Sequence, residues 1–135
     1  METFRKIEQW AKNREITDQS TPGHQYGKLL EEVGELGTSL VERARWQIQY
    51  SGADRSDFNL AHSEAIDAIG DCVVVLTIIA AMLGTSIDEC IQQAYDTIKA
   101  RKGMMISGKF VKYDNLDDQH KAIIDARVDT EAAPV

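Results

Sequence analysis

The chain has 135 residues, which is long enough for one domain with its own apolar core and without disulfide or metal staples. Hydrophobic residues make up 43% of the chain and charged residues 27%, values that are ordinary for a soluble globular protein. The net charge of −7 argues against general nucleic-acid binding, which requires a basic face.

Helical spacing of apolar residues predicts four main helices, at residues 3–12, 25–49, 60–83 and 86–101. The polar segments NREITDQSTPGHQ and SGADRSDFN between them are expected to be loops. Gly84 is expected to end the third helix as a left-handed cap, and Ser86 with Glu89 forms a capping-box pattern at the start of the fourth.

The pattern changes after Gly103. The segment MMISGKFVKY is expected to be extended or to form a short hairpin. Beyond it lie one helical stretch, DDQHKAIIDARV, and an end, DTEAAPV, that is expected to be disordered. The predicted fold is all-α: a helical bundle of about four main helices in a domain of residues 1–113, then an acidic, partly helical or disordered tail of residues 114–135.

The longest apolar run, CVVVLTIIAAML at residues 72–83, is shorter than the roughly 20 residues that cross a bilayer. The N-terminal segment is amphipathic and lacks the apolar run of a signal peptide, so we expect a cytoplasmic protein with no membrane partner. Because this run is apolar on almost every side, it must be covered all round. We therefore predict a homo-oligomer built around the third helix, a dimer or a dimer of dimers.

Carboxylates recur at helical spacing on the second and third helices. On the second, Glu32 and Glu35 share a strip beside an expected core stripe of Leu29, Val33, Leu36 and Leu40. On the third, Asp67 and Asp71 share a face that continues into apolar residues. A hard divalent cation such as Mg²⁺ would remove the repulsion and the desolvation cost of such acids. A solvated acidic face, with intrahelical pairs to Lys28 and Arg43, explains the second helix equally well.

The motifs EEVGEL and DAIGDCVVVL, followed by AYDTIKARKGMMISGKFVK, resemble the MazG-like proteins of the all-α nucleoside triphosphate pyrophosphohydrolase superfamily, which are common in phages and bacteria. The resemblance covers about residues 25–112. The superfamily pattern is EExxE followed by ExxD, and Glu31, Glu32 and Glu35 match its first part. Ala68 stands where the second motif has Glu, so either Asp67 or Glu64, one turn upstream, replaces that ligand.

The resemblance implies Mg²⁺-dependent cleavage of a nucleoside triphosphate between its α- and β-phosphates, with Mn²⁺ as an alternative ion. The implied metal ligands are Glu32, Glu35, Asp67 and Asp71, and Glu31 is the candidate base that orients or deprotonates the attacking water. Candidates for contacts with substrate are Lys28, Lys99, Arg101 and Lys102 for the phosphates, and Gln25 and Trp46 for the base.

Two other functions remain open at this point. One is a non-catalytic helical module for interaction or assembly, in which the acids are only a solvated face. The other keeps the metal site but acts on a modified nucleotide or an alarmone.

Overall fold

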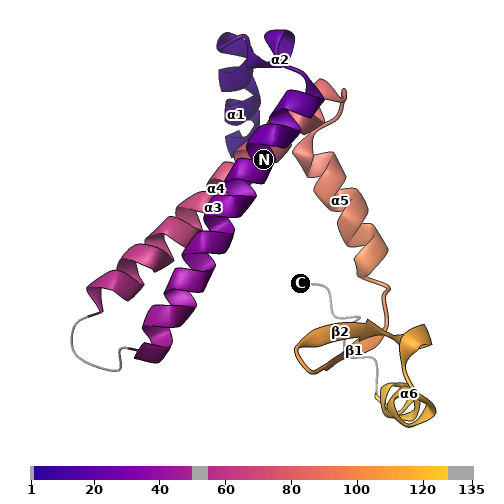
Figure 1. The fold of residues 1–135 in the computed structure, drawn as a ribbon. Helices are drawn as coiled ribbons and strands as arrows, with labels where there is room; N and C mark the ends of the chain where they lie inside the picture. The colour runs from indigo at the N-terminus through magenta and orange to yellow at the C-terminus, as the bar shows by residue number, and fades with distance from the viewer. Residues whose placement is uncertain (1, 50–54, 128–135) are drawn as a thin grey trace. The chain divides into compact units, whose positions relative to one another are not determined.

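The structure is a computed structural model that describes residues 2–49 and 55–127. It confirms the all-α fold with a short hairpin (Figure 1). Its elements are, in chain order, α1 (Glu2–Asn13), α2 (Ile16–Gln19), α3 (Pro22–Gln49), α4 (Ser56–Met82), α5 (Ile87–Ile98), β1 (Gly103–Ile106), β2 (Lys109–Lys112), the 3-10 helix η1 (Tyr113–Asn115) and α6 (Asp118–Asp125).

Local sequence decides where the long helices begin and end. α3 begins at Pro22 rather than at residue 25, because the Thr21 hydroxyl accepts a hydrogen bond from the His24 N–H (3.1 Å) and proline suits the first helical position. The loop that was expected before it contains the single turn of α2. After α4, Gly84 has a φ of 76°, which confirms the predicted left-handed cap.

The chain divides into two compact units with the boundary between Gln92 and Gln93, inside α5. In the second unit, β1 and β2 pair antiparallel around a tight turn at Ser107 and Gly108, which both have positive φ. The Tyr113 N–H donates to the Lys102 carbonyl, and the Tyr113 hydroxyl donates to Asp125 at 2.9 Å.

These two bonds tie the segment after the hairpin to the hairpin itself. The predicted division into a domain of residues 1–113 and a tail of residues 114–135 stays a prediction. The expected disordered end, residues 129–135, lies outside the described residues.

In the first unit, α3 and α4 run antiparallel and side by side (Figure 1). The buried residues of α3 are Glu32 and Ser39, and Leu29 and Leu36 beside them are half-buried. This alternating three- and four-residue spacing is typical of a coiled-coil seam. On α4 the seam is formed by small residues, which let the two helices approach closely: Ala61, Ala65 and Ala68, followed by Val75.

The predicted core stripe on α3 is wrong for two of its four members. Val33 and Leu40 are about half exposed, whereas Glu32 occupies the seam. The prediction chose apolar residues at three- and four-residue spacing. A seam that repeats every 3.5 residues instead passes through Leu29, Glu32 and Leu36 and leaves Val33 to one side.

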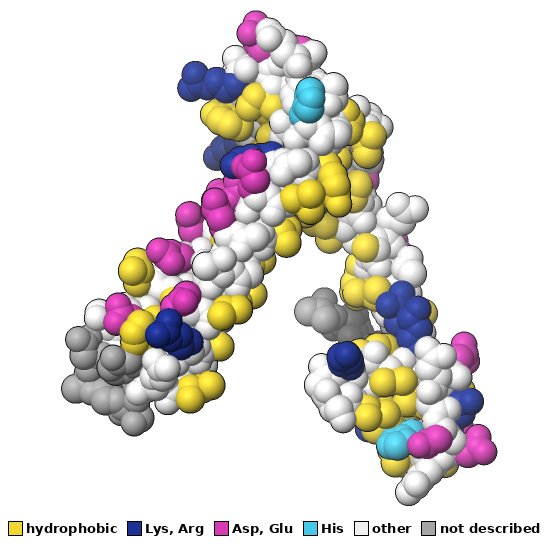
Figure 2. All heavy atoms as spheres, viewed as in Figure 1, with side chains coloured by type: hydrophobic (Ala, Val, Ile, Leu, Met, Phe, Trp, Pro, Cys, Tyr) yellow, Lys and Arg dark blue, Asp and Glu magenta, His cyan; other side chains and the backbone are white. Residues whose placement is uncertain are grey.

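A second apolar surface therefore faces outward. At 100° per residue, its members lie on one side of the α3–α4 seam and the carboxylates lie on the other. Figure 2 shows this division, with hydrophobic side chains mainly along one edge of the hairpin and acidic ones along the opposite edge. We call this second apolar surface the outer apolar face. It comprises Tyr26, Leu30, Val33, Leu40 and Val41 of α3 and Ile66, Ile69 and Leu76 of α4.

One helix of the described chain, α4, is long and apolar enough to cross a membrane, by length and composition alone. Only 33% of its most apolar 18-residue stretch is buried within the structure. The apolar run at residues 72–83 was too short to span a bilayer when taken alone, but it is part of a helix of 27 residues.

We predict that Ala65→Leu destabilises the protein by about 1–3 kcal/mol, because the added atoms force α3 and α4 apart. Urea unfolding at a fixed protein concentration measures this effect. The control is Ala94→Leu on the exposed surface of α5, which should change the free energy of unfolding by less than about 0.5 kcal/mol. Equal effects of the two substitutions would mean that the seam is not closely packed.

Candidate functional site

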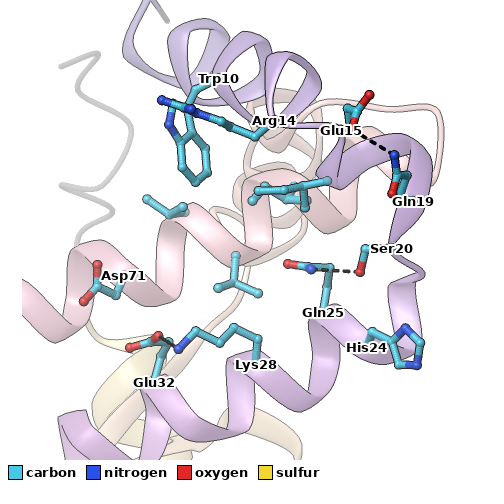
Figure 3. Close-up of a pocket in the computed structure, with 14 residues that line it drawn as sticks. Trp10, Arg14, Glu15, Gln19, Ser20, His24, Gln25, Lys28, Glu32 and Asp71 are labelled. Carbon is cyan, nitrogen blue, oxygen red and sulfur yellow. Dashed lines mark hydrogen bonds and ion pairs between the residues drawn. The ribbon is translucent and has the colours of Figure 1, made fainter.

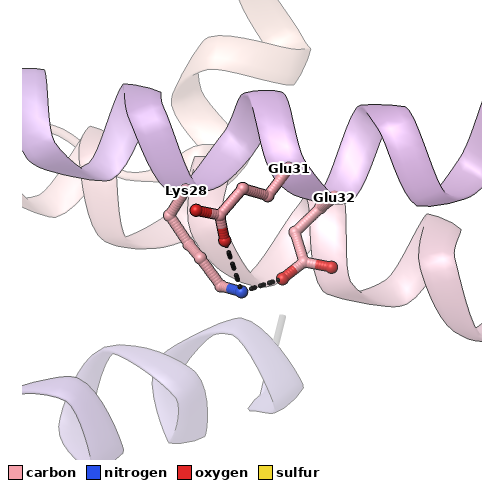
Figure 4. Close-up of polar contacts among 3 residues, drawn as sticks. All are labelled: Lys28, Glu31 and Glu32. Atoms are coloured by element: carbon pink, nitrogen blue, oxygen red, sulfur yellow. Dashed lines mark hydrogen bonds and ion pairs between the residues drawn. The ribbon is translucent and has the colours of Figure 1, made fainter.

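The carboxylates of the first predicted motif lie at the edge of the α3–α4 seam. Glu32 is only 6% exposed, although it is charged. Its carboxylate forms an ion pair with Lys28, one turn earlier on α3, at 2.7 Å. The same Lys28 ammonium contacts Glu31 at 3.2 Å, so one cation bridges both acids (Figure 4).

These contacts keep Lys28 charged. Hydrogen bonds to Glu32 and then to Glu31 raise its pKa above the ordinary lysine value. In the structure Lys28 therefore neutralises the acids, as expected of an intrahelical pair. Glu32 is buried rather than solvated, however, and Arg43 donates to His62 at 2.9 Å. The Lys28 ammonium also marks a position where this carboxylate pair accepts a cation.

Asp71 approaches the same region from α4. Burial of its carboxyl group raises its pKa above the ordinary 3.8, and the neighbouring carboxylates of Asp67 and Glu32 raise it further. The Lys28 ammonium acts in the opposite direction. Carboxylates from both helices thus lie close enough to Asp71 to disfavour its charged form.

A pocket of about 550 Å³, here called the Trp10 pocket, opens beside Glu32 and Asp71 (Figure 3). The Trp10 indole lines it from α1, and Val74, Val75 and Ile78 of α4 also line it. The two carboxylates lie at one end of the pocket. Side chains that can form neutral hydrogen bonds lie toward the other end: Gln19, Ser20 and Gln25.

A second hollow of about 600 Å³, the acidic groove, follows the same side of the α3–α4 pair. Its acidic lining residues are Glu31, Glu35, Glu64 and Asp67. The four predicted metal ligands are thus divided between the two hollows, with Glu32 and Asp71 at the Trp10 pocket and Glu35 and Asp67 at the acidic groove.

Residues 2–49 and 55–127 contain no group of three or more His, Cys, Asp or Glu side chains arranged to hold a metal ion. The four predicted ligands therefore do not surround one point in this conformation. The donors nevertheless suit Mg²⁺, which is commonly held by one or two carboxylates while waters and substrate phosphates complete its coordination. Glu32 with Asp71 supplies such a pair.

The other predicted contact residues are placed differently. Gln25 lines the Trp10 pocket, but Trp46 lies 21 residues further along α3, or about 31 Å at the helical rise. Within one chain the two cannot contact the same base. Lys99, Arg101 and Lys102 belong to the second unit, where Lys99 pairs with Asp96 at 2.6 Å.

The sequence analysis missed most of the Trp10 pocket. Its walls come from α1, α2, α3 and α4, and α2 lies in a segment that was expected to be a loop. One signal was available: the spacing of Leu29, Glu32, Leu36 and Ser39 matches a seam, and it would have placed Glu32 between the helices.

An uncharacterized 18.2 kDa protein from the rep-hol intergenic region of Haemophilus phage HP1 is 35% identical to this chain over 77 residues. The match covers 57% of this chain but only 37% of the phage protein. No family model matches the chain, and no solved structure matches it significantly. The similarity connects the chain with a phage protein whose name states no activity.

We predict that Asp71→Asn stabilises the metal-free protein at pH 7. Because the folded state raises the pKa of Asp71, it binds the proton more tightly than the unfolded state does, and wild-type stability falls as the pH rises through and above 3.8. Asparagine does not ionise, so the variant does not lose this stability. Its free energy of unfolding should exceed that of the wild type at pH 7, and the difference should disappear below about pH 3.8.

Thermal unfolding of the two proteins between pH 3 and pH 8, in the presence of a chelator, measures this difference. Glu42→Gln, at an exposed ion pair on the same face of α3, is the control and should give no comparable gain. A lower stability of Asp71→Asn at pH 7 would show that the carboxylate has a favourable partner in the folded protein.

Proposed function

We propose that the protein is a Mg²⁺-dependent hydrolase that cleaves nucleoside triphosphates between the α- and β-phosphates, as its resemblance to MazG-like proteins implies. One observation carries the proposal: Glu32 and Asp71 meet, with unfavourable electrostatics, at the end of a pocket large enough for a nucleoside. A carboxyl group beside a pocket whose pKa is raised by burial and by neighbouring carboxylates, as that of Asp71 is, is typical of a functional site.

Glu32 and Asp71 would hold Mg²⁺ together with the triphosphate. When bound, the ion would neutralise phosphate charge and lower the pKa of a coordinated water. Glu35 and Asp67 line the adjacent acidic groove, where they can hold a second cation on the same polyphosphate. The proposal thus uses all four predicted ligands, in two pairs.

Lys28 and Glu31 would change partners when substrate binds. The Lys28 ammonium can move from the two carboxylates to a phosphate oxygen, which leaves Glu31 free to act as a base. Glu31 would take a proton from the attacking water while the water oxygen bonds to the α-phosphorus. The bond from that phosphorus to the bridging oxygen breaks, and pyrophosphate leaves with the bridging oxygen.

Lys99, Arg101 and Lys102 remain predicted phosphate contacts. Lys99 has an acidic partner in Asp96, and hydrogen bonding to that carboxylate raises its pKa, so it is charged at neutral pH. The two neighbouring cations are exposed and can provide further positive charge for phosphate oxygens.

We further propose that a second copy of the chain covers the outer apolar face. Two α3–α4 hairpins that pair through this face form a four-helix bundle, and the acidic side of each hairpin stays open to substrate. A bilayer is a poorer partner for α4, because Glu64, Asp67 and Asp71 would then enter or border hydrocarbon.

The same face also favours a second candidate, a non-catalytic assembly module, because it would serve that role without any reaction. The two candidates differ in their dependence on the acids: in an assembly module, Mg²⁺ with a nucleotide analogue should leave the melting temperature unchanged.

The activity test is a screen of nucleoside triphosphates with Mg²⁺, in which monophosphate plus pyrophosphate is resolved from diphosphate plus phosphate. We expect the first pair of products, and a loss of at least about 100-fold in kcat/KM for Asp71→Asn and for Glu32→Gln, because each removes a ligand charge. Glu42→Gln is the matched control and should keep full activity. Retained activity in Asp71→Asn, or diphosphate as the product, would contradict the proposal.

The oligomer test uses Ile69→Glu, which places a charge in the centre of the outer apolar face. Sedimentation velocity should show a dimer or larger assembly for the wild type and a shift to monomer for this variant, because the buried charge has no partner. Ser63→Glu, at an exposed position of α4 away from that face, should leave the mass unchanged. A monomeric wild type would exclude the proposed interface.

A further inference from the structure

The polar end of the Trp10 pocket presents hydrogen-bond acceptors. The Gln25 side-chain N–H donates to the Ser20 hydroxyl at 3.0 Å, and this contact is partly buried. This bond engages one of the two amide N–H groups, while the amide oxygen points toward the interior of the pocket (Figure 3). Gln25 offers a ligand an acceptor.

Gln19, at the end of α2, also donates a side-chain N–H to a neighbouring residue. One of its side-chain N–H groups donates to the Glu15 carboxylate at 2.9 Å, and its carbonyl oxygen can accept a hydrogen bond from a ligand. The Glu15 carboxylate, which also lines the pocket, is itself an acceptor. These three side chains can accept hydrogen bonds from a ligand, and the pocket lining also contains the donors Arg14 and Lys28.

The rest of the pocket suits the flat, apolar faces of a base. Trp10 lines it from α1, and Val74, Val75 and Ile78 provide apolar contacts from α4. An indole that is about half exposed has a free face on which a base can stack. A base that enters between these groups leaves its sugar and phosphates directed toward Glu32 and Asp71, at the other end.

We infer that the Trp10 pocket selects nucleotides whose base carries an exocyclic amino group at its hydrogen-bonding edge, as cytosine and adenine do, and that Gln25 is the residue that reads this group. The amino groups of cytosine and adenine are donors, whereas uracil and thymine present a carbonyl oxygen at the equivalent position. That oxygen would place an acceptor opposite the Gln25 oxygen, so no hydrogen bond would form between the two.

This inference rests on the proposed function, because the first of its two tests compares rates of nucleotide hydrolysis. CTP and UTP differ in the amino or oxo group of the base and in the proton that uracil, unlike cytosine, carries on the adjacent ring nitrogen; ATP and ITP form a second such pair. We expect kcat/KM for CTP to exceed that for UTP by about tenfold to a hundredfold, the effect of one unsatisfied buried polar group. Gln25→Leu should reduce this ratio to nearly one, and Gln25→Glu, which also offers acceptors, should preserve the preference for the amino base.

A binding measurement tests base selection separately from the proposed hydrolase activity, because it requires neither metal nor hydrolysis. In a Trp46→Phe background, Trp10 is the single tryptophan, and its fluorescence reports the pocket directly. CMP should quench this fluorescence at lower concentration than UMP by the same factor, and Gln25→Leu should remove the difference. Circular dichroism would confirm that each variant is folded.

The possible outcomes distinguish the two proposals. Selective quenching by CMP without any hydrolysis would support the pocket and overturn the enzymatic proposal. Hydrolysis of CTP and UTP with equal efficiency, unchanged in Gln25→Leu, would overturn the assignment of Gln25 and leave the enzyme. Equal quenching by CMP and UMP would also count against the assignment.

Discussion

The close packing of α3 against α4 is the constraint on which the rest of the first unit depends. Alanines at three successive seam positions of α4 let the helices approach, so acids from both helices are brought together at the edge of the seam. Glu32 is buried there, and its field reaches Asp71 on the opposite helix. With larger residues in place of the alanines, the two carboxylates would be separated by an apolar layer.

This arrangement is unfavourable for stability alone. A seam of two helices would be better served by a leucine at position 32, and Asp71 is disfavoured as a charged group by burial and by two neighbours. Lys28 offsets part of this cost through its two ion pairs. Acids kept at such a place are understandable if a cation and a polyphosphate replace Lys28 during function.

The two sides of the hairpin differ in character. Its acidic side carries the Trp10 pocket and the acidic groove, while the opposite side carries the exposed residues of the outer apolar face, where we propose that a second copy binds. The core within one chain consists largely of alanines and buries little apolar surface, so a second copy would supply stability that the single chain lacks. Substrate binding and assembly would then not compete for the same surface.

Helical periodicity and cap residues by themselves determined the class of fold, the approximate helix positions, the Gly84 cap and the segment that forms the hairpin. These features depend on neighbours within a few residues, which the sequence displays directly. The presence of Glu32 and Asp71 near one another was also predictable, since each lies at the edge of an apolar stripe.

Only the tertiary structure decided which residues share a pocket. Trp10 and Gln25 line one pocket because α1, α2 and the start of α3 enclose the same space, whereas Trp46 lies 21 residues further along α3. Tertiary packing also decided that Val33 faces outward and Glu32 inward. Such contacts depend on the rotation and separation of whole helices, and periodicity within one helix does not specify which of its faces a neighbour will cover.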